Sequence, residues 1–128
     1  MKLSLRSEYA LLCLIHLARS SRECSLPQIA AAQDISPELL GEVLAVLKHA
    51  GYLGQTDGCY RLNNSPEDVS VAEIIRLFDG ALAPCEPVSS RGYAAAPMDK
   101  EEKLTGMFDQ LQAQIEARLE STTIADLV

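Results

Sequence analysis

The 128-residue sequence lacks a long apolar run, which excludes a membrane-spanning helix. No apolar stretch approaches the roughly 20 residues that a helix needs to cross a bilayer. The first residues do not read as a secretion signal, because His16 interrupts the apolar stretch 9–18 and no small-residue cleavage site follows. We therefore expect a cytoplasmic protein with no membrane partner, in which the cysteines stay mostly reduced.

Metal and catalytic motifs are missing as well. There is no C-x-x-C pair, so a zinc site is not expected, and the histidines His16 and His49 have no ligand spacing. We place no Ser/His/Asp or Cys/His arrangement, no phosphate-binding loop and no acid/base carboxylate pair. These absences argue against an enzyme.

Positive charge is scarce. The formal net charge is −7, from 11 basic and 18 acidic residues, and this alone argues against a nucleic-acid partner. The excess lies in the second half, because residues 1–62 carry six basic and six acidic residues while residues 63–128 carry five and twelve. A neutral first half can still present a local basic surface to phosphates, although with weak and salt-sensitive binding.

The first half of the chain carries helix signals. Apolar residues over 9–20 are dense enough to predict a largely buried helix. Ser25 starts a second, short helix, and Gln28 stands three residues later, as a capping box requires. After a turn at 34–36, Ser36 caps a third helix that Gly51 ends. Two helices joined by so short a turn predict a helix-turn-helix.

A β-hairpin is predicted directly after these helices. Asp57-Gly58 is a strong hairpin-turn dipeptide, and it lies between the short apolar segments 52–53 and 59–62. Cys24 is placed in a loop. A hairpin in this position is a wing, so the predicted fold class is mainly α with a small β-hairpin.

The second half begins with a fourth helix. Ser70 caps it, Glu73 completes a capping box, and Gly80 ends it. Residues 81–97 are irregular, and a long loop in a small domain is often functional or disordered.

The longest helix is predicted over residues 98–119. An apolar seam close to a heptad repeat runs along it, formed by Leu104, Phe108, Leu111, Ile115 and Leu119. The seam packs either on its own domain or, as we favour, on the same helix of a second copy. Thr123 is placed to cap a last turn over 124–128.

Motifs along the whole chain resemble one family, the Rrf2-type transcriptional regulators, which include iron–sulfur and nitric-oxide sensors. The resemblance rests on the order and separation of short segments: Met1-Lys2-Leu3-Ser4, Tyr9-Ala10-Leu11, Ile35-Ser36-x-x-Leu39-Leu40, Leu47-Lys48-His49-Ala50-Gly51, Gly58-x-Tyr60-Arg61-Leu62, Val69-Ser70-Val71-Ala72-Glu73-Ile74-Ile75, Asp79-Gly80 and Thr122-Thr123-Ile124-Ala125-Asp126-Leu127-Val128. It implies a winged-helix DNA-binding domain over 1–80, a sensor loop over 81–97, and a dimerisation helix with a short C-terminal turn over 98–128. It also implies a homodimer on a roughly palindromic duplex, and often an iron–sulfur cluster.

The cluster site departs from the family pattern. Cys85 matches the first of the family's three cysteines, but residues 88–103 contain no cysteine or histidine. Glu8 stands where some members carry an extra acidic ligand from the partner subunit; its other reading is an acid favoured by the helix dipole. Two ligands do not make the four that a cluster needs. We therefore expect no metal and no bound cofactor, with Cys85 as a reactive thiol or partial cluster ligand being the alternative.

The DNA-reading parts depart from the pattern too. The residues predicted to face base edges include Ser36, which is either a helix cap or a phosphate contact, together with Pro37, Glu38 and Glu42. The wing is short, and Gln55 and Thr56 stand near its tip where the family often has arginine. The predicted phosphate contacts, each of which has a plain surface role as its alternative, are Lys2, Arg6, Tyr9, Lys48, His49 and Arg61.

The leading hypothesis is therefore a homodimeric regulator that binds double-stranded DNA without a three-cysteine cluster. Its signal is left open among a small molecule in the 81–97 region, a thiol event at Cys85, and a partner protein. The alternative is a protein-interaction or dimerisation module that has lost strong DNA binding, which the short wing and weak basic surface favour.

Overall fold

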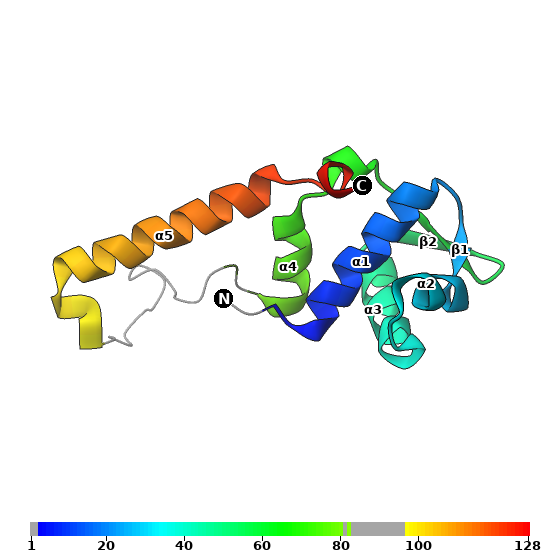
Figure 1. Ribbon diagram of the computed structural model, residues 1–128, viewed down its shortest axis with the longest axis horizontal. Coiled ribbons are helices and arrows are strands. Elements are labelled where there is room, and N and C mark those ends of the chain that lie inside the picture. The colour runs from blue at the N-terminus through cyan, green and yellow to red at the C-terminus, as the bar shows by residue number, and fades with distance from the viewer. Residues whose placement is uncertain (1–2, 81, 83–96) are drawn as a thin grey trace.

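The computed structural model describes residues 3–80, 82 and 97–128. Four helices and a small sheet form a compact head, from which a long helix extends to one side (Figure 1). The helices of the head are α1 (Leu5–Ser20), α2 (Leu26–Gln33), α3 (Pro37–His49) and α4 (Val71–Asp79), and the long helix is α5 (Glu102–Ser121). The predicted fold class, mainly helical with a winged helix-turn-helix head, is confirmed.

Helix α1 begins four residues before the predicted start. Ser4 caps it, because its Oγ accepts a hydrogen bond from the Ser7 amide at 3.1 Å. Only Leu5, Arg6, Glu8 and Arg19 are exposed along the helix, so the prediction of a largely buried helix is confirmed.

The helix-turn-helix forms as the capping signals predicted. At the start of α2 the Ser25 amide donates to Gln28 Oε1 at 2.8 Å, and the Gln28 amide donates to Ser25 Oγ at 3.3 Å. Asp34 ends this helix in the left-handed conformation, with a φ of 54°. Ser36 Oγ then accepts from the Leu39 amide at 3.5 Å and caps α3.

The wing consists of β2 (Leu53–Thr56) and β3 (Cys59–Leu62), with a tight turn between them. Asp57 and Gly58 both have positive φ, 53° and 78°, as this type of hairpin turn requires. A third strand, β1 (Cys24–Ser25), pairs with the other edge of β3. The placement of Cys24 in a loop was therefore wrong: a two-residue strand has no sequence period of its own, and only its pairing with the wing defines it.

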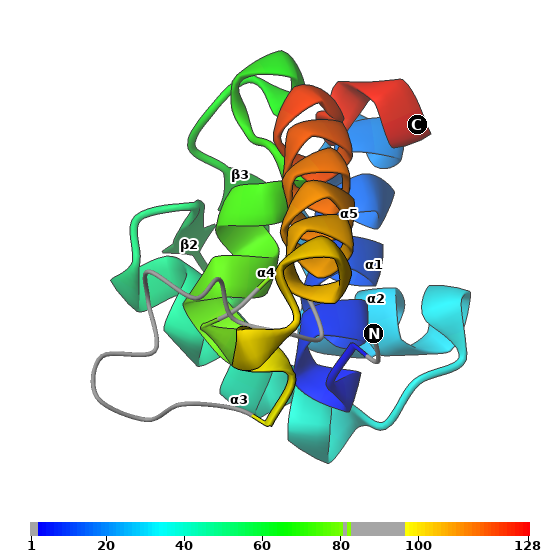
Figure 2. The same ribbon diagram turned by 90° about the vertical axis from the view of Figure 1, so that its left-hand side faces the viewer.

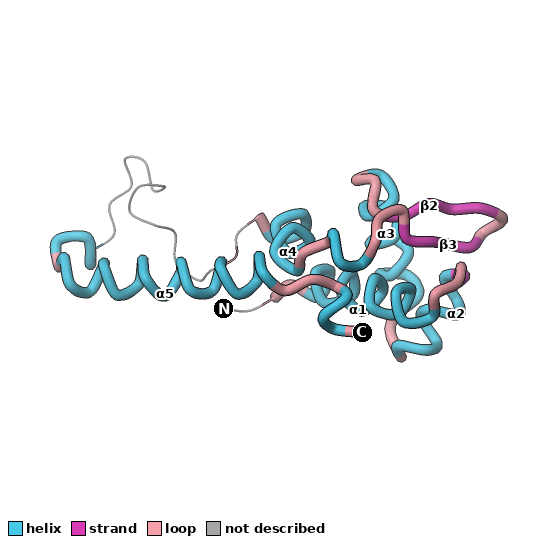
Figure 3. Tube along the Cα trace, turned by 90° about the horizontal axis from the view of Figure 1, so that it is seen from above, coloured by secondary structure: helices cyan, strands magenta, loops and turns pink. Residues whose placement is uncertain are grey.

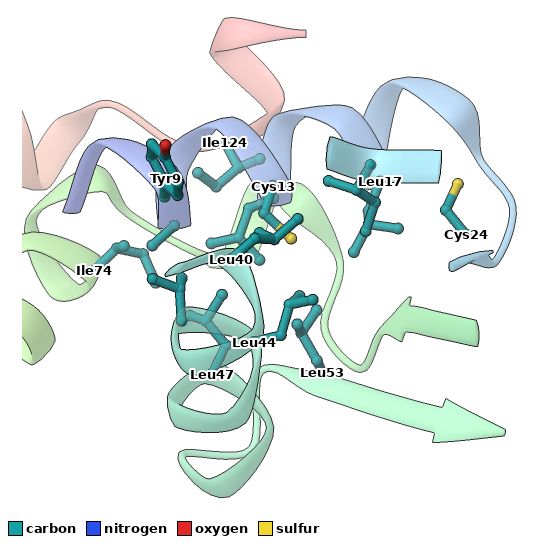
Figure 4. Close-up of a cluster of buried hydrophobic side chains, with 14 of the residues drawn as sticks. Tyr9, Cys13, Leu17, Cys24, Leu40, Leu44, Leu47, Leu53, Ile74 and Ile124 are labelled. Atoms are coloured by element: carbon teal, nitrogen blue, oxygen red, sulfur yellow. The ribbon is translucent and has the colours of Figure 1, made fainter. Parts of the chain in front are cut away.

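The core of the head lies between α1, α3 and the wing. Figure 4 shows Tyr9, Cys13 and Leu17 of α1 facing the α3 side chains, with Leu53 from the wing and Ile74 from α4 closing the cluster. Ile124, from the end of the chain, is 1% exposed and belongs to this cluster.

Backbone hydrogen bonds hold the C-terminal segment in place. The Ile124 amide donates to the Val69 carbonyl at 2.9 Å, and the Val71 amide donates to the Thr122 carbonyl at 2.8 Å. Thr123 caps the last turn as predicted, since its Oγ1 accepts from the Asp126 amide at 3.3 Å. The start of α4 and the end of the chain are therefore fixed to each other.

Helix α5 begins at Glu102 rather than at residue 98, because Pro97–Lys100 form a separate 3-10 turn. Its C-terminal end packs on α4, where Leu119 contacts a small apolar cluster that includes Val71 and Ile75, and where Arg76 pairs with Glu120. Viewed along its axis, α5 lies in front of α4 and α1 (Figure 2). No helix in the described ranges is long and apolar enough to cross a membrane.

The wing and the N-terminal end of α5 lie at opposite ends of the molecule. The view from above shows β2 and β3 extending from one side of the head and α5 from the other (Figure 3). A partner on α5 would therefore leave the wing accessible.

Candidate nucleic-acid interface

The DNA-contacting residues predicted from the sequence lie on the start of α1, on α3 and on the wing. Four of them lie exposed at the start of α3 or one turn later, namely Ser36, Pro37, Glu38 and Glu42. The buried face of the same helix carries Leu40, Val43, Leu44 and Leu47. Because the apolar face fixes the helix on the core, the opposite face is presented to solvent. Lys2 lies outside the described residues.

Arg6 and Glu42 form an ion pair that joins the start of α1 to the exposed face of α3. Arg6 Nη2 lies 3.0 Å from Glu42 Oε2, and both side chains are more than half exposed. The arginine compensates the charge of Glu42, which would otherwise repel phosphates. Glu38, one turn earlier, is exposed beside the positive end of the α3 dipole.

Tyr9 and Ser36 hold the beginning of α3 against α1. Tyr9 is only 9% exposed, and its hydroxyl oxygen accepts a hydrogen bond from the Ser36 amide at 3.1 Å. Ser36 Oγ is engaged as the helix cap, so the cap interpretation of this residue is confirmed. A phosphate contact through the Tyr9 hydroxyl proton stays a prediction.

Lys48 and Gln55 connect the end of α3 to the wing. Lys48 Nζ donates to Gln55 Oε1 at 3.0 Å, and both side chains are exposed. His49 is exposed beside Lys48 in the last turn of α3. Cations are favoured at this end of a helix, so the Lys48 ammonium places a stabilised positive charge next to the wing.

Arg61 lies across the wing. Its Nη1 donates to Thr56 Oγ1 at 2.7 Å, and its register partner on β2 is Gly54. A Cβ atom on Gly54 would lie 2.7 Å from the Arg61 Cζ, so the guanidinium occupies the space above this glycine. Gly54 was not predicted as part of the interface, although counting back from the Asp57-Gly58 turn places it opposite Arg61.

Eight of the predicted contact residues occur as four pairs. They are Arg6 with Glu42, Tyr9 with Ser36, Lys48 with Gln55, and Arg61 with Thr56. Each pair joins two separate helices or strands of the head. The sequence predicted these residues but not their pairing. Arg6 with Glu42 and Tyr9 with Ser36 are too far apart in sequence for their contact to be predicted. Three of the paired residues, Arg6, Lys48 and Arg61, are exposed cations of the kind that contact phosphates.

The start of α1 is also tied to the end of α4. The Ser4 amide donates to Asp79 Oδ2 at 3.2 Å. Partial burial raises the pKa of the Asp79 carboxyl, but hydrogen bonding from Ser4 and Ser7 together outweighs this effect, and the pKa is lowered overall. Asp79 therefore stabilises the segment that presents Arg6.

The residues of the predicted sensor site are only partly described. Cys85 lies outside the described residues, and Glu8 is exposed in the first turn of α1. Of the cysteines in the described part of the chain, Cys13 and Cys24 are buried and Cys59 is half-buried, all as free thiols. Burial raises the pKa of Cys13 to about 12, which makes it an inert core thiol. No three His, Cys, Asp or Glu side chains among the described residues gather to hold a metal ion.

Comparison with known proteins agrees with this architecture. The Rrf2 family model, described as an iron-dependent transcriptional regulator, matches residues 3–128. The HTH-type transcriptional regulator CymR of Bacillus subtilis is 27% identical over 132 residues, covering 99% of this chain and 89% of CymR.

Solved structures show the same arrangement. The structure of CymR, the global cysteine regulator of B. subtilis, superposes with a TM-score of 0.75 and covers 99% of this chain and 95% of its own. The IscR structure from T. potens is 25% identical, has a TM-score of 0.73, and covers 99% of this chain and 85% of its own. With its helix-turn-helix, wing and long C-terminal helix, the chain belongs to the Rrf2 family and is a winged-helix, DNA-binding transcriptional regulator.

Proposed function

We propose that this regulator acts as a homodimer, held together through α5, which binds a DNA duplex with two copies of its head. The observation that carries the proposal is an uncovered apolar surface on α5. Leu104, Met107 and Leu111 are 41%, 52% and 42% exposed. Large apolar side chains grouped on a helix that projects from its own domain are typical of an interface.

A second copy of the same helix is the occupant that fits this surface. Leu104, Phe108, Leu111 and Ile115 follow a spacing near the heptad, so two such helices can interlock their side chains. Leu119 differs from the other members of the predicted seam, because it packs on α4 of its own head. We therefore propose that the four residues before Leu119 face the second copy, while Leu119 packs within its own head.

The DNA surface is proposed on the opposite side of the head from this seam. The start of α3 would face base edges with Ser36, Pro37, Glu38 and Glu42, while Gln55 and Thr56 would reach the duplex at the tip of the wing. The phosphate contacts would be Arg6, Tyr9, Lys48, His49, Arg61 and Lys2. A twofold dimer would place two such surfaces on a duplex with twofold-related half-sites.

We further propose that the protein regulates without a three-cysteine iron–sulfur cluster. Cys85 is followed by no cysteine or histidine through residue 103, and the buried Cys13 and Cys24 lie inside the head. Even with Glu8 of a second copy, the set falls short of four ligands. A thiol reaction at Cys85 stays the alternative for sensing.

The oligomeric state tests the proposal. The wild-type protein should have twice the 13.9 kDa chain mass by light scattering at micromolar concentration. Leu111→Glu should give a folded monomer, because it places a charge in the seam, whereas Gln114→Glu on the same helix should leave the dimer unchanged. A wild-type monomer that binds its duplex as a monomer would contradict the proposal.

One observation favours a second function, a protein-interaction module with weak DNA binding. The net charge is −7, and Arg6, Lys48 and Arg61 all have partners within the head. Binding to a labelled promoter fragment at two salt concentrations separates the alternatives, because a specific DNA-binding protein competes with non-specific DNA and shows a salt slope.

A further inference from the structure

Gly54 and Arg61 face each other across the wing, and the space that a side chain on Gly54 would need is filled by the arginine. A Cβ atom built on Gly54 would lie 2.7 Å from both Cζ and Nη2 of Arg61, and 2.9 Å from Oδ1 of Asn63. Both distances are shorter than the contacts that a real Cβ atom makes with neighbouring atoms. The Arg61 guanidinium therefore lies directly against the backbone of β2.

Thr56 fixes the far end of this arginine. Its Oγ1 accepts from Arg61 Nη1 at 2.7 Å. Asn63 closes the other side, since its Nδ2 donates to the Gly51 carbonyl at 3.1 Å and this bond orients the amide oxygen toward Gly54. An exposed arginine would otherwise sample many rotamers, so these neighbours reduce the freedom of its guanidinium.

The backbone does not require glycine at position 54. The glycines with positive φ among the described residues are Gly51, Gly58 and Gly80. Gly54 lies within a strand, where glycine normally weakens the structure relative to alanine. Its glycine is therefore explained by the space that it leaves for Arg61.

We propose that Gly54 and Thr56 are positioning residues that hold the Arg61 guanidinium flat on the wing, as a preset donor for one phosphate of the DNA backbone. Thr56 uses one N–H of the guanidinium, and a guanidinium has others that suit a phosphate. This inference rests on the proposed DNA-binding surface.

Gly54→Ala is an informative variant, because the atoms that it displaces are the far ends of two exposed side chains, Arg61 and Asn63. The hairpin should fold as before, with an unfolding temperature equal to or above that of the wild type. The guanidinium must move away from β2, so the preset geometry is lost while the charge stays. Stability and DNA affinity should therefore change independently.

The test is a double-mutant cycle measured with a labelled duplex that the wild-type protein selects from a random library. We expect Gly54→Ala and Thr56→Val each to weaken binding, Gly54→Ala by about threefold to tenfold. Arg61→Met should lower the salt slope by about 0.9, as expected for one lost phosphate contact. In the Arg61→Met background Gly54→Ala should not weaken binding further. Thr56→Val should weaken it less there than in the wild type, because only the proposed direct contact of Thr56 with the duplex is left to lose. Gly106→Ala on α5, where a Cβ meets nothing within 4 Å, is the matched control and should bind as the wild type does.

Equal losses with and without Arg61 would overturn the proposal, since the two residues would then act through the hairpin itself. Unchanged affinity of Gly54→Ala in the wild-type background would overturn it too. Failure of the folded wild-type protein to bind any duplex is a different result, which would overturn the proposed surface and this inference with it.

Discussion

Arg6 Nη2 lies 3.0 Å from Glu42 Oε2, so the start of α1 is paired with the exposed face of α3. The two side chains are exposed, and a pair of this kind adds little to stability, on the order of 0.5 kcal/mol. We expect its effect to fall instead on DNA binding, because in the proposed interface phosphates and Glu42 would compete for Arg6.

Glu42→Gln should therefore tighten binding to non-specific duplex DNA. The change removes a negative charge from the binding face and leaves Arg6 free for a phosphate, so the affinity should rise by roughly threefold to tenfold at low salt. Fluorescence anisotropy at two salt concentrations measures it. Glu116→Gln on α5 is the control, and a weaker complex with non-specific DNA would contradict the assignment.

Charge reversal at Arg61 should weaken binding to every duplex alike. A phosphate contact carries no direct sequence information, so Arg61→Glu should lower affinity by at least about tenfold without changing which sequence is preferred. Arg118→Glu, on α5, should have little effect. An altered sequence preference with unaltered overall affinity would show that Arg61 reads bases.

Ile124→Ala should destabilise the head strongly, although the residue lies four positions from the end of the chain. Ile124 is 1% exposed and packs in the main core, so the free energy of unfolding should fall by about 2–4 kcal/mol. Leu127→Ala, at a side chain that is 41% exposed, should cost about 0.5 kcal/mol or less. Urea unfolding followed by circular dichroism compares the two, and equal losses would contradict the packing described.

Asp79 should contribute stability that disappears in acid. The pKa of its carboxyl is lowered in the folded state, so the stabilisation is present above the ordinary pKa of 3.8 and is lost as the pH falls through the lowered value. Asp79→Asn should cost about 1 kcal/mol at neutral pH, and this difference should shrink as the pH is lowered toward 3. Asp109→Asn is the control. If the difference in unfolding free energy between wild type and Asp79→Asn stayed constant down to pH 3, the ionised carboxylate would not be the source of the stabilisation.

Protein purified without oxygen should be colourless, because Cys85, the single cysteine among residues 81–97, cannot by itself hold a cluster with four ligands. The visible spectrum and iron content measure this. A visible absorbance band with stoichiometric iron would contradict the proposal and make Cys85 and Glu8 ligands to examine first.

The helix boundaries that depend on nearby residues could be predicted from the sequence. Ser25 with Gln28 and Ser36 with Leu39 are local capping signals within one turn, and Asp57-Gly58 fixed the hairpin turn in the same way. The start of α1 was missed because the cap at Ser4 precedes the apolar pattern by a full turn.

Features that depend on contacts between distant residues were not predictable in this way. Strand β1 exists only through its pairing with β3, and the ion pair of Arg6 with Glu42 depends on how α1 crosses α3. For the site, the chemistry of each candidate residue was readable from its type and position. The partner of each candidate residue could be identified only from the folded structure of the head.

We propose above all sequence-specific DNA binding by the helix-turn-helix and the wing. Its most direct test is a titration of the wild-type protein against a labelled duplex that it selects, with excess non-specific DNA, at two salt concentrations. We predict that the complex survives the competitor and weakens as salt rises. If non-specific DNA competed as effectively as the selected duplex at both salt concentrations, the protein would not be a sequence-specific DNA-binding protein.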